Sequence, residues 1–131
     1  METRQSNADK TALVVEDNAA IRGMLVTAFL SNGVFQTCAE AENGKEGIEI
    51  ARKVHPDIVT MDLSMPVMNG MEAASELRKL FPSTPIILFT LYGDGISQTE
   101  AAKYGISLVL SKTTPLSMLI VIAHRLLGLP D

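Results

Sequence analysis

Apolar residues along the chain follow two spacings in turn, which predicts strands and helices in succession. Five short apolar runs fit β-strands, and they span residues 11–16, 34–40, 57–61, 85–90 and 106–111. After each run, apolar residues return every three or four positions, which is typical of an amphipathic helix. Gly, Asn and Pro residues separate the segments. The pattern therefore predicts five strands that alternate with five helices.

The helices are predicted from their start signals, stop signals and apolar faces. The first follows Asn18 as N-cap, the second ends before Pro56, the third spans 71–80, the fourth about 94–104, and the last runs to Gly128. Thr114-Pro115 is predicted as N-cap and first residue of the last helix. The residues predicted to face the core are Ile21, Met24, Leu25, Ala28, Phe29, Ile48, Ala51, Val54, Ala74, Leu77, Leu80, Leu116, Leu119, Ile120, Ala123 and Leu127.

Strands that alternate with helices of this length imply right-handed crossovers and a parallel sheet with helices on both faces. We therefore predict an α/β fold, an open three-layer sandwich. Residues 1–10 are expected to be a flexible tail, 11–128 the domain, and 129–131 its end or the start of a linker. In such sheets the ligand site lies outside the carboxyl ends of the strands.

Polar residues terminate four of the five strands. Glu16-Asp17 ends the first, Asp62 the third, Thr90 the fourth and Ser111-Lys112 the fifth. Each residue has an ordinary structural interpretation, because acids cap helices and turns and a lysine after a strand is commonly solvated. Together they predict a site in which three acids converge with a hydroxyl and an ammonium.

A divalent cation explains why acids that repel one another would be kept together. Mg²⁺ takes hard oxygen ligands and is usually bound through one or two carboxylates. Two carboxylates and a backbone carbonyl from the loop after Asp62 would fit Mg²⁺, or Mn²⁺. An aspartate beside such an ion can also attack phosphorus and form an acyl phosphate.

Composition narrows the class of partner. The chain has 131 residues, 47% of them hydrophobic, and a net charge of −4, with no run of Lys or Arg. This favours one folded domain over a direct binder of nucleic acid or anionic membrane. The single Cys38 suggests a reducing compartment, and the N-terminus has no apolar signal segment, so we expect a cytoplasmic location and no membrane partner.

The chain resembles the receiver domain of two-component response regulators. Its successive signatures appear in order as "LVVEDN", "AENGKEGIEIA", "HPDIVTMDLSMPVMNG", "PIILFT" and "LVLSK". The wording is closest to receivers that precede a helix-turn-helix output domain. The resemblance covers residues 11–128, and it implies a flavodoxin-like sheet of order 2-1-3-4-5.

The resemblance also implies roles and partners. Asp62 would accept a phosphoryl group from a sensor histidine kinase or a phosphotransfer protein. Asp17, Asp62 and the Ser64 carbonyl would hold Mg²⁺, with Glu16 acting through a water, while Thr90 and Lys112 would bind the phosphoryl group. The protein would catalyse only its own phosphorylation and dephosphorylation. It would regulate transcription and touch DNA only through an output domain absent from this chain.

Three positions depart from the family pattern. Val109 stands where the family usually has Tyr or Phe, so a switch based on a rotating ring is in doubt. Leu91 follows Thr90 where a small residue is common, and with Tyr92 it is predicted to restrict access to the acyl phosphate. Thr113 replaces a proline that often has a cis bond, and a non-proline cis bond would cost about 2.5–4 kcal/mol.

The last helix suggests a surface for self-association. Its outward residues are predicted to be Ser117, Met118, Val121, Ile122, His124 and Arg125. Met118, Val121 and Ile122 form an apolar group that a solvated helix does not need, which predicts a homodimer through the last strand and helices.

Three other classes of protein compete with this interpretation. A haloacid-dehalogenase-type phosphatase needs a second acid where Ser64 stands, and a flavodoxin-type flavin module needs a phosphate loop where the chain has Glu16-Asp17-Asn18. A degenerate receiver, which binds proteins without being phosphorylated, stays open as the alternative.

Overall fold

The fold is a parallel sheet between two layers of helices, as predicted. The computed structural model describes residues 9–31, 33–91 and 96–129. The sheet order is β2-β1-β3-β4-β5, and every pair of neighbours is parallel. The elements are β1 (Lys10–Val15), α2 (Ala19–Leu30), β2 (Phe35–Ala41), α3 (Gly44–Val54), β3 (Ile58–Met61), α4 (Gly70–Leu80), β4 (Ile86–Thr90), α5 (Gln98–Ala102), β5 (Leu108–Ser111) and α6 (Leu116–Leu126).

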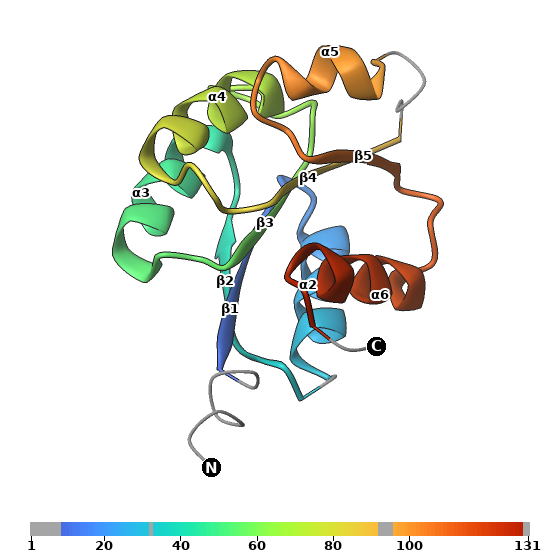
Figure 1. The fold of residues 1–131 in the computed structure, drawn as a ribbon. Helices are drawn as coiled ribbons and strands as arrows, with labels where there is room; N and C mark the ends of the chain where they lie inside the picture. Colours follow the sequence, from blue (N-terminus) through green and yellow to red (C-terminus); the bar gives the residue numbers. More distant parts are fainter. Residues whose placement is uncertain (1–8, 32, 92–95, 130–131) are drawn as a thin grey trace.

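Each face of the sheet has its own hydrophobic core. Helices α3, α4 and α5 lie on one side, and α2 and α6 lie on the other (Figure 1). The first core includes Leu13, Val15 and Leu77, and the second includes Leu25 and Phe29. β3 lies in the middle of the sheet, so all four of its residues are buried. Its apolar sequence without alternation fits this position, because parallel strands covered on both faces are apolar throughout.

Short polar side chains set the starts of four helices. Asn18, Asn43, Asn69 and Ser97 each accept a hydrogen bond from the backbone N–H three residues later. These bonds satisfy N–H groups that a helix leaves without an internal partner. The Asn69 backbone N–H also donates to the Glu72 side chain, which completes a capping box and fixes the end of the loop that follows β3.

Several predicted orientations and boundaries are wrong. Met24 and Leu80 are 56% and 40% exposed, because the apolar face of each helix is wider than the surface it covers. Thr114 does not cap α6, since Pro115 holds the N-cap position without a side-chain hydrogen bond. α5 begins at Gln98 rather than near residue 94, because Ser97 caps it there, and β5 begins at Leu108.

His124 is a further correction, because it was predicted to face outward and is buried. Its ring lies 6.3 Å from the ring of Phe35, measured between centroids, on the inner side of α6. The neighbouring residues Leu119 and Ala123 are fully buried, as predicted. α6 therefore presents a wider face to the sheet than its apolar residues alone indicate.

The edge strand β2 carries the only cysteine of the chain. Cys38 is a half-buried free thiol that packs at the edge of the second core. Burial raises the pKa of this thiol to about 12, and the nearby charge of Glu40 acts in the same direction. The thiol is therefore protonated at neutral pH.

The amino ends of the strands are tied together by hydrogen bonds. Arg78 donates to the carbonyl oxygens of Phe81, Pro82 and Gly105 over 2.7–3.1 Å. Asp57 and Thr11 pair reciprocally, with the Asp57 N–H donating to the Thr11 carbonyl and the Thr11 N–H donating to Asp57 Oδ2, both over 2.8 Å. These contacts join α4 to the segments that precede β4 and β5, and β1 to the start of β3, at the ends of the strands opposite the polar ends.

Candidate functional site

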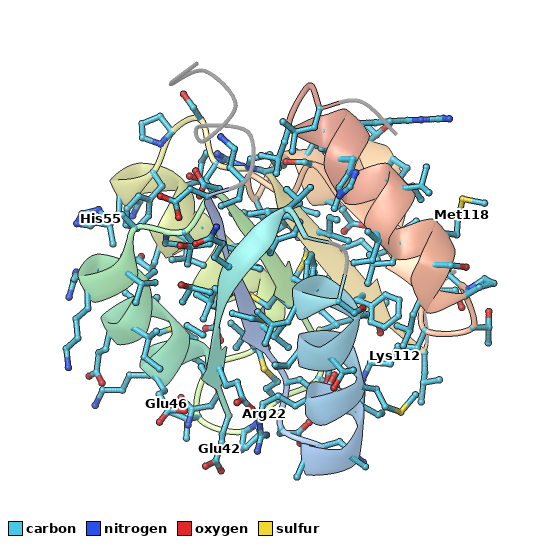
Figure 2. All side chains as sticks on the ribbon, turned by 90° about the horizontal axis from the view of Figure 1, so that it is seen from below. Arg22, Glu42, Glu46, His55, Lys112 and Met118 are labelled. Carbon is cyan, nitrogen blue, oxygen red and sulfur yellow. The ribbon has the colours of Figure 1, made fainter. Side chains whose placement is uncertain are left out.

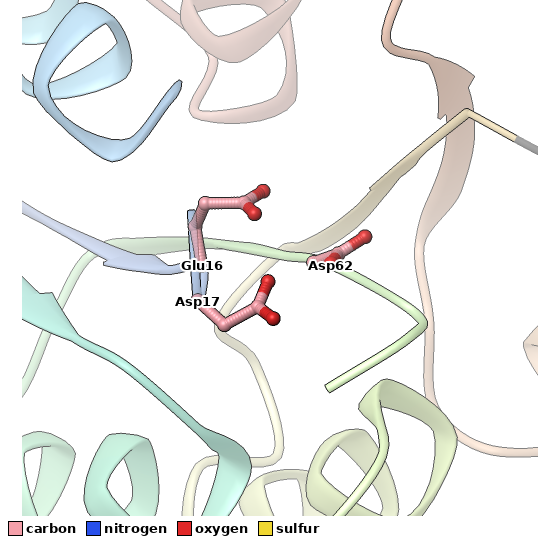
Figure 3. A group of neighbouring side chains, drawn as sticks. All are labelled: Glu16, Asp17 and Asp62. Carbon is pink, nitrogen blue, oxygen red and sulfur yellow. The ribbon is translucent and has the colours of Figure 1, made fainter. Parts of the chain in front are cut away.

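The carboxyl ends of the strands bring three acids together. Glu16 and Asp17 follow β1, and Asp62 follows β3, the strand beside it. Each offers a carboxylate oxygen that lies within 4.8 Å of the others, and Figure 3 shows the three side chains at the same strand ends. Glu16 and Asp62 are buried, whereas Asp17 is exposed. This edge is therefore an acidic pocket that solvent reaches from the side of Asp17.

Lys112 enters the pocket from the end of β5. Its Nζ lies 2.8 Å from Glu16 Oε1 and 3.3 Å from Asp62 Oδ1, and 9% of its side chain is exposed. Its backbone N–H donates to the Thr90 carbonyl over 2.9 Å, which fixes where the side chain leaves the strand. No cis peptide bond occurs among the described residues, so the bond from Lys112 to Thr113 is trans.

Burial controls the electrostatics of the pocket. It raises the pKa of Glu16, against the opposing effect of the Lys112 hydrogen bond. It also raises the pKa of Asp62, against the charge of Lys112, and the nearby Asp17 charge adds to this increase. Burial works to lower the pKa of Lys112, but the hydrogen bond to Glu16 and the charge of Asp62 outweigh it, so that pKa is raised. The carboxylates and the ammonium therefore depend on one another for their charged states.

Hydrogen bonds from the main chain and from Arg22 hold Glu16 in place. The Asn18 N–H donates to Glu16 Oε2 over 3.1 Å, while Lys112 occupies the other oxygen. Arg22 Nη1 donates to the Glu16 carbonyl over 2.7 Å, and Arg22 also pairs with Glu40. Figure 2 shows Arg22 and Lys112 in the lower half of the view. Both oxygens of Glu16 thus have protein partners.

The loop after Asp62 packs tightly against it. The Ser64 main chain donates a hydrogen bond to Asp62, and Ser64 itself is exposed. Gly70 begins α4 so close to Asp62 that a Cβ at this position would lie 2.3 Å from the Asp62 carbonyl oxygen. The Asn-Gly pair is therefore needed for a helix cap and a close approach, besides ending a turn.

Val67 forms a strained tip on the same loop. Its φ is +71°, and the Met68 N–H donates to the Pro66 carbonyl over 2.7 Å, which closes a three-residue turn. A β-branched residue rarely adopts a positive φ, because its side chain crowds the backbone there. The side chain is 77% exposed, so no core packing compensates the strain.

Thr90 and Leu91 lie beside the acidic pocket at the end of β4. Thr90 is buried and pairs with Ser111 of β5, whereas Leu91 is 57% exposed. Leu91 lines a cavity of about 360 Å³ together with Met24, Phe89 and Lys112. Tyr92, which was predicted to act with Leu91, lies outside the described residues. The position of Leu91 is compatible with control of access, which stays a prediction.

Val109 is buried, with 8% exposed, on the edge strand β5. Its backbone is held by the Gln98 side chain, a contact that was not predicted from the sequence.

On α6, Met118 is 49% exposed and points away from the sheet (Figure 2), while Val121 and Ile122 are half-buried. The outward apolar group is therefore smaller than the sequence indicated.

The donor set fits a small hard cation. Carboxylate oxygens within 4.8 Å of one another suit Mg²⁺ or Mn²⁺, which prefer oxygen ligands and retain several waters. Asp17 is exposed and Asp62 adjoins it, so these two could bind an ion directly, whereas Glu16 is already occupied by Lys112 and Asn18. This distribution agrees with the indirect role expected for Glu16.

Sequence reasoning placed Glu16 and Lys112 in one pocket but missed their direct ion pair. One available signal is the length of Glu16, since glutamate reaches farther from a strand end than aspartate. The tight contact of Gly70 with Asp62 was also missed. Its signal was the Asn-Gly pair directly before a predicted helix.

Comparisons with known proteins agree with the fold. The family model of the response regulator receiver domain matches residues 12–124. The chemotaxis protein CheY of Thermotoga maritima is 40% identical over 96 residues, which cover 73% of this chain and 79% of that protein. The regulatory protein AtoC of Escherichia coli is 37% identical over 89% of this chain, which spans only 25% of AtoC. The receiver domain of the Francisella response regulator 1452 matches with a TM-score of 0.82 and 26% identity, over 92% of this chain and 98% of that one.

Proposed function

The chain belongs to the response regulator receiver family, and on that premise we propose that it is a phosphorylation switch with Asp62 as the acceptor. The observation that carries the proposal is the meeting of Asp62, Asp17, Thr90 and Lys112 at adjacent strand ends. The domain is proposed to span residues 11–128. Among the described residues no helix is long and apolar enough to cross a membrane.

The proposed reaction is a transfer from a phosphorylated histidine to Asp62. An oxygen of the Asp62 carboxylate attacks phosphorus, a P–O bond forms, and the P–N bond breaks. The imidazole leaves with the electron pair and is protonated. Asp62 suits this role because it must be ionised to attack, and Lys112 at 3.3 Å favours that charged state despite burial.

Lys112 and Thr90 are proposed to receive the transferred group. Lys112 lies between Glu16 and Asp62, so its ammonium can turn toward a phosphoryl oxygen on Asp62 while Glu16 holds its other side. Thr90 ends the strand next to β3 and could donate its hydroxyl. Asp17, Asp62 and the Ser64 carbonyl would hold Mg²⁺ or Mn²⁺, which supplies charge neutralisation on the phosphoryl oxygens.

The partners and location follow the same premise. The phosphoryl donor is proposed to be a sensor histidine kinase or a phosphotransfer protein, acting in the cytoplasm. The chain is proposed to catalyse only its own phosphorylation and dephosphorylation. Transcription would be regulated, and DNA contacted, only through an output domain.

Mass spectrometry after incubation with acetyl phosphate and Mg²⁺ tests the acceptor. The wild type should gain one phosphoryl group, and Asp62→Asn should gain none. Asp57→Asn is the matched control, since Asp57 lies at the opposite edge of the sheet and should leave labelling intact. An unlabelled wild type would favour the degenerate receiver, and labelling of Asp62→Asn would overturn the assignment.

Access and output carry two smaller proposals. Leu91 is proposed to narrow the route to the acyl phosphate, so Leu91→Ala should change the half-life of phosphorylated Asp62, and an equal half-life would contradict this.

Met118, Val121 and Ile122 are proposed to take part in a homodimer through α6 and the last strand. Sedimentation of Val121→Glu, with and without a phosphate mimic, should show weaker association, and unchanged association would exclude this face.

A further inference from the structure

The open edge of β5 is covered by one side chain. β5 is the last strand of the sheet, so it pairs with β4 on one side only. The Val109 N–H donates to Gln98 Oε1 over 2.9 Å, and Gln98 Nε2 donates to the Val109 carbonyl over 2.9 Å. A side-chain amide has both a donor and an acceptor, so it can replace the two main-chain contacts that a neighbouring strand would supply.

This amide contact attaches α5 to the sheet, beside the packing of one buried alanine. α5 has five residues, and Ala101 is the buried one among them. Gln98 is its first residue and binds β5 directly, while Thr90, where the preceding strand ends, pairs with Ser111. A strand with one neighbour depends on such contacts for its lateral position.

β5 in turn carries Lys112 into the acidic pocket. Lys112 is the first residue after the strand, and its ammonium lies 2.8 Å from Glu16 and 3.3 Å from Asp62. The Lys112 backbone N–H is bound to the Thr90 carbonyl and only 9% of the side chain is exposed, so the end of β5 fixes the point from which the ammonium reaches both acids. The position of β5 therefore decides whether both contacts are made.

We propose that Gln98 is a positioning residue for Lys112 and acts through the backbone of Val109. In this role Gln98 touches neither the phosphoryl group nor the acceptor. It holds β5 so that the Lys112 ammonium stays between Glu16 and Asp62. As far as the reaction is concerned, this inference rests on the proposed phosphorylation of Asp62, whereas the geometry of Lys112 can be tested without it.

Gln98→Met is the variant that tests the inference. Methionine keeps the length and helix preference of glutamine but has no N–H donor and only a weak acceptor. Thr99→Ala is the control, because Thr99 is the next residue of α5 and is exposed. NMR would follow hydrogen exchange at the Val109 amide and at the Lys112 ammonium. The rate of Asp62 labelling would be measured against acetyl phosphate concentration with Mg²⁺, at a temperature where every variant is folded.

In Gln98→Met the Val109 amide should exchange about tenfold faster, because the two hydrogen bonds are lost. The Lys112 ammonium signal should exchange faster or broaden, and the maximal labelling rate should fall severalfold at an unchanged half-saturating donor concentration. Thr99→Ala should match the wild type in all three measurements. If the wild type is not labelled at all, the proposed function fails and the Lys112 signal alone decides this inference.

Three results would overturn the inference. Unchanged exchange at Val109 would mean that Gln98 does not hold the strand. Faster exchange at Val109 with an unchanged Lys112 ammonium signal would mean that Gln98 only covers the sheet edge. Loss of thermal stability alone would have the same meaning, because a purely structural residue lowers stability without moving Lys112.

Discussion

The two ends of the sheet differ in how their polar groups are paired. At the amino ends, Arg78 saturates three carbonyl oxygens and Asp57 pairs reciprocally with Thr11. At the carboxyl ends, two buried carboxylates share one lysine, and burial raises the pKa of both carboxyl groups. The strained Val67 also lies at this second end.

The difference shows that the amino ends of the strands stabilise the fold, whereas the carboxyl ends destabilise it. Hydrogen bonds from a guanidinium to carbonyls join the segments they touch, so the amino end favours a single arrangement. Buried acids that crowd one lysine are costly, and such groups cluster at sites where reactivity is needed. Side-chain changes at the amino ends should therefore affect stability. Changes to the acids at the carboxyl ends should affect reactivity more than stability.

Gly70→Ala should have the largest effect, because it should lower both the stability of the fold and the reactivity of Asp62. The new Cβ would lie 2.3 Å from the Asp62 carbonyl oxygen, so the backbone must move. We expect a loss of about 3 kcal/mol in the free energy of unfolding, measured by urea denaturation, together with slower Asp62 labelling. Gly23→Ala is the control, since its Cβ would meet no atom within 4 Å, and it should stabilise α2 by about 0.5–1 kcal/mol.

Arg78→Ala should break the amino end alone. Removing the guanidinium leaves the Phe81, Pro82 and Gly105 carbonyls without this donor, so we expect a loss of about 2 kcal/mol in the free energy of unfolding. Asp62 labelling well below the melting temperature should be unchanged. Lys79→Ala, whose side chain is 71% exposed, should cost less than about 0.5 kcal/mol. A large loss of labelling in Arg78→Ala would contradict the separation of the two ends.

Asp62→Asn should have the smallest effect on stability, and that effect should be a gain. The folded protein holds Asp62 with a raised pKa, so ionised Asp62 destabilises the fold at neutral pH. Asn removes that charge, so the free energy of unfolding should rise at pH 7. The gain should shrink as pH falls through the folded pKa of Asp62, since the wild type then takes up a proton before its unfolded state does. A gain that grows with acid would refute the sign of this effect.

The sequence predicted the sheet, its helices and the strand-end pocket because each depends on a local pattern. Residues that end buried strands must meet at one edge of a parallel sheet, so Asp17, Asp62 and Lys112 could be placed together before any coordinates. It was harder to predict which helical residues face the core, because Met24, Leu80 and His124 lie at the borders of their helical faces. There the fit to the neighbouring element decides burial.

Pairings between distant segments could not be predicted. Glu16 and Lys112 follow β1 and β5, which β3 and β4 separate in the sheet, so their ion pair depends on how far the two side chains reach across the strand ends. Gln98 is an exposed residue of a short helix, and nothing in its neighbours indicates that its amide binds Val109. The strain at Val67 is likewise hidden, since the residue type gives no sign of a positive φ.

The protonated state of Cys38 has a practical consequence for spectroscopy. A thiol with a pKa of about 12 has only about one part in 100,000 as thiolate at pH 7, against about 3% for an ordinary cysteine. Maleimide dyes react with the thiolate, so a single cysteine introduced at exposed Met118 should be modified selectively while Cys38 stays intact. A fluorophore or spin label on α6 could thus report on movements of that helix without first removing the native thiol.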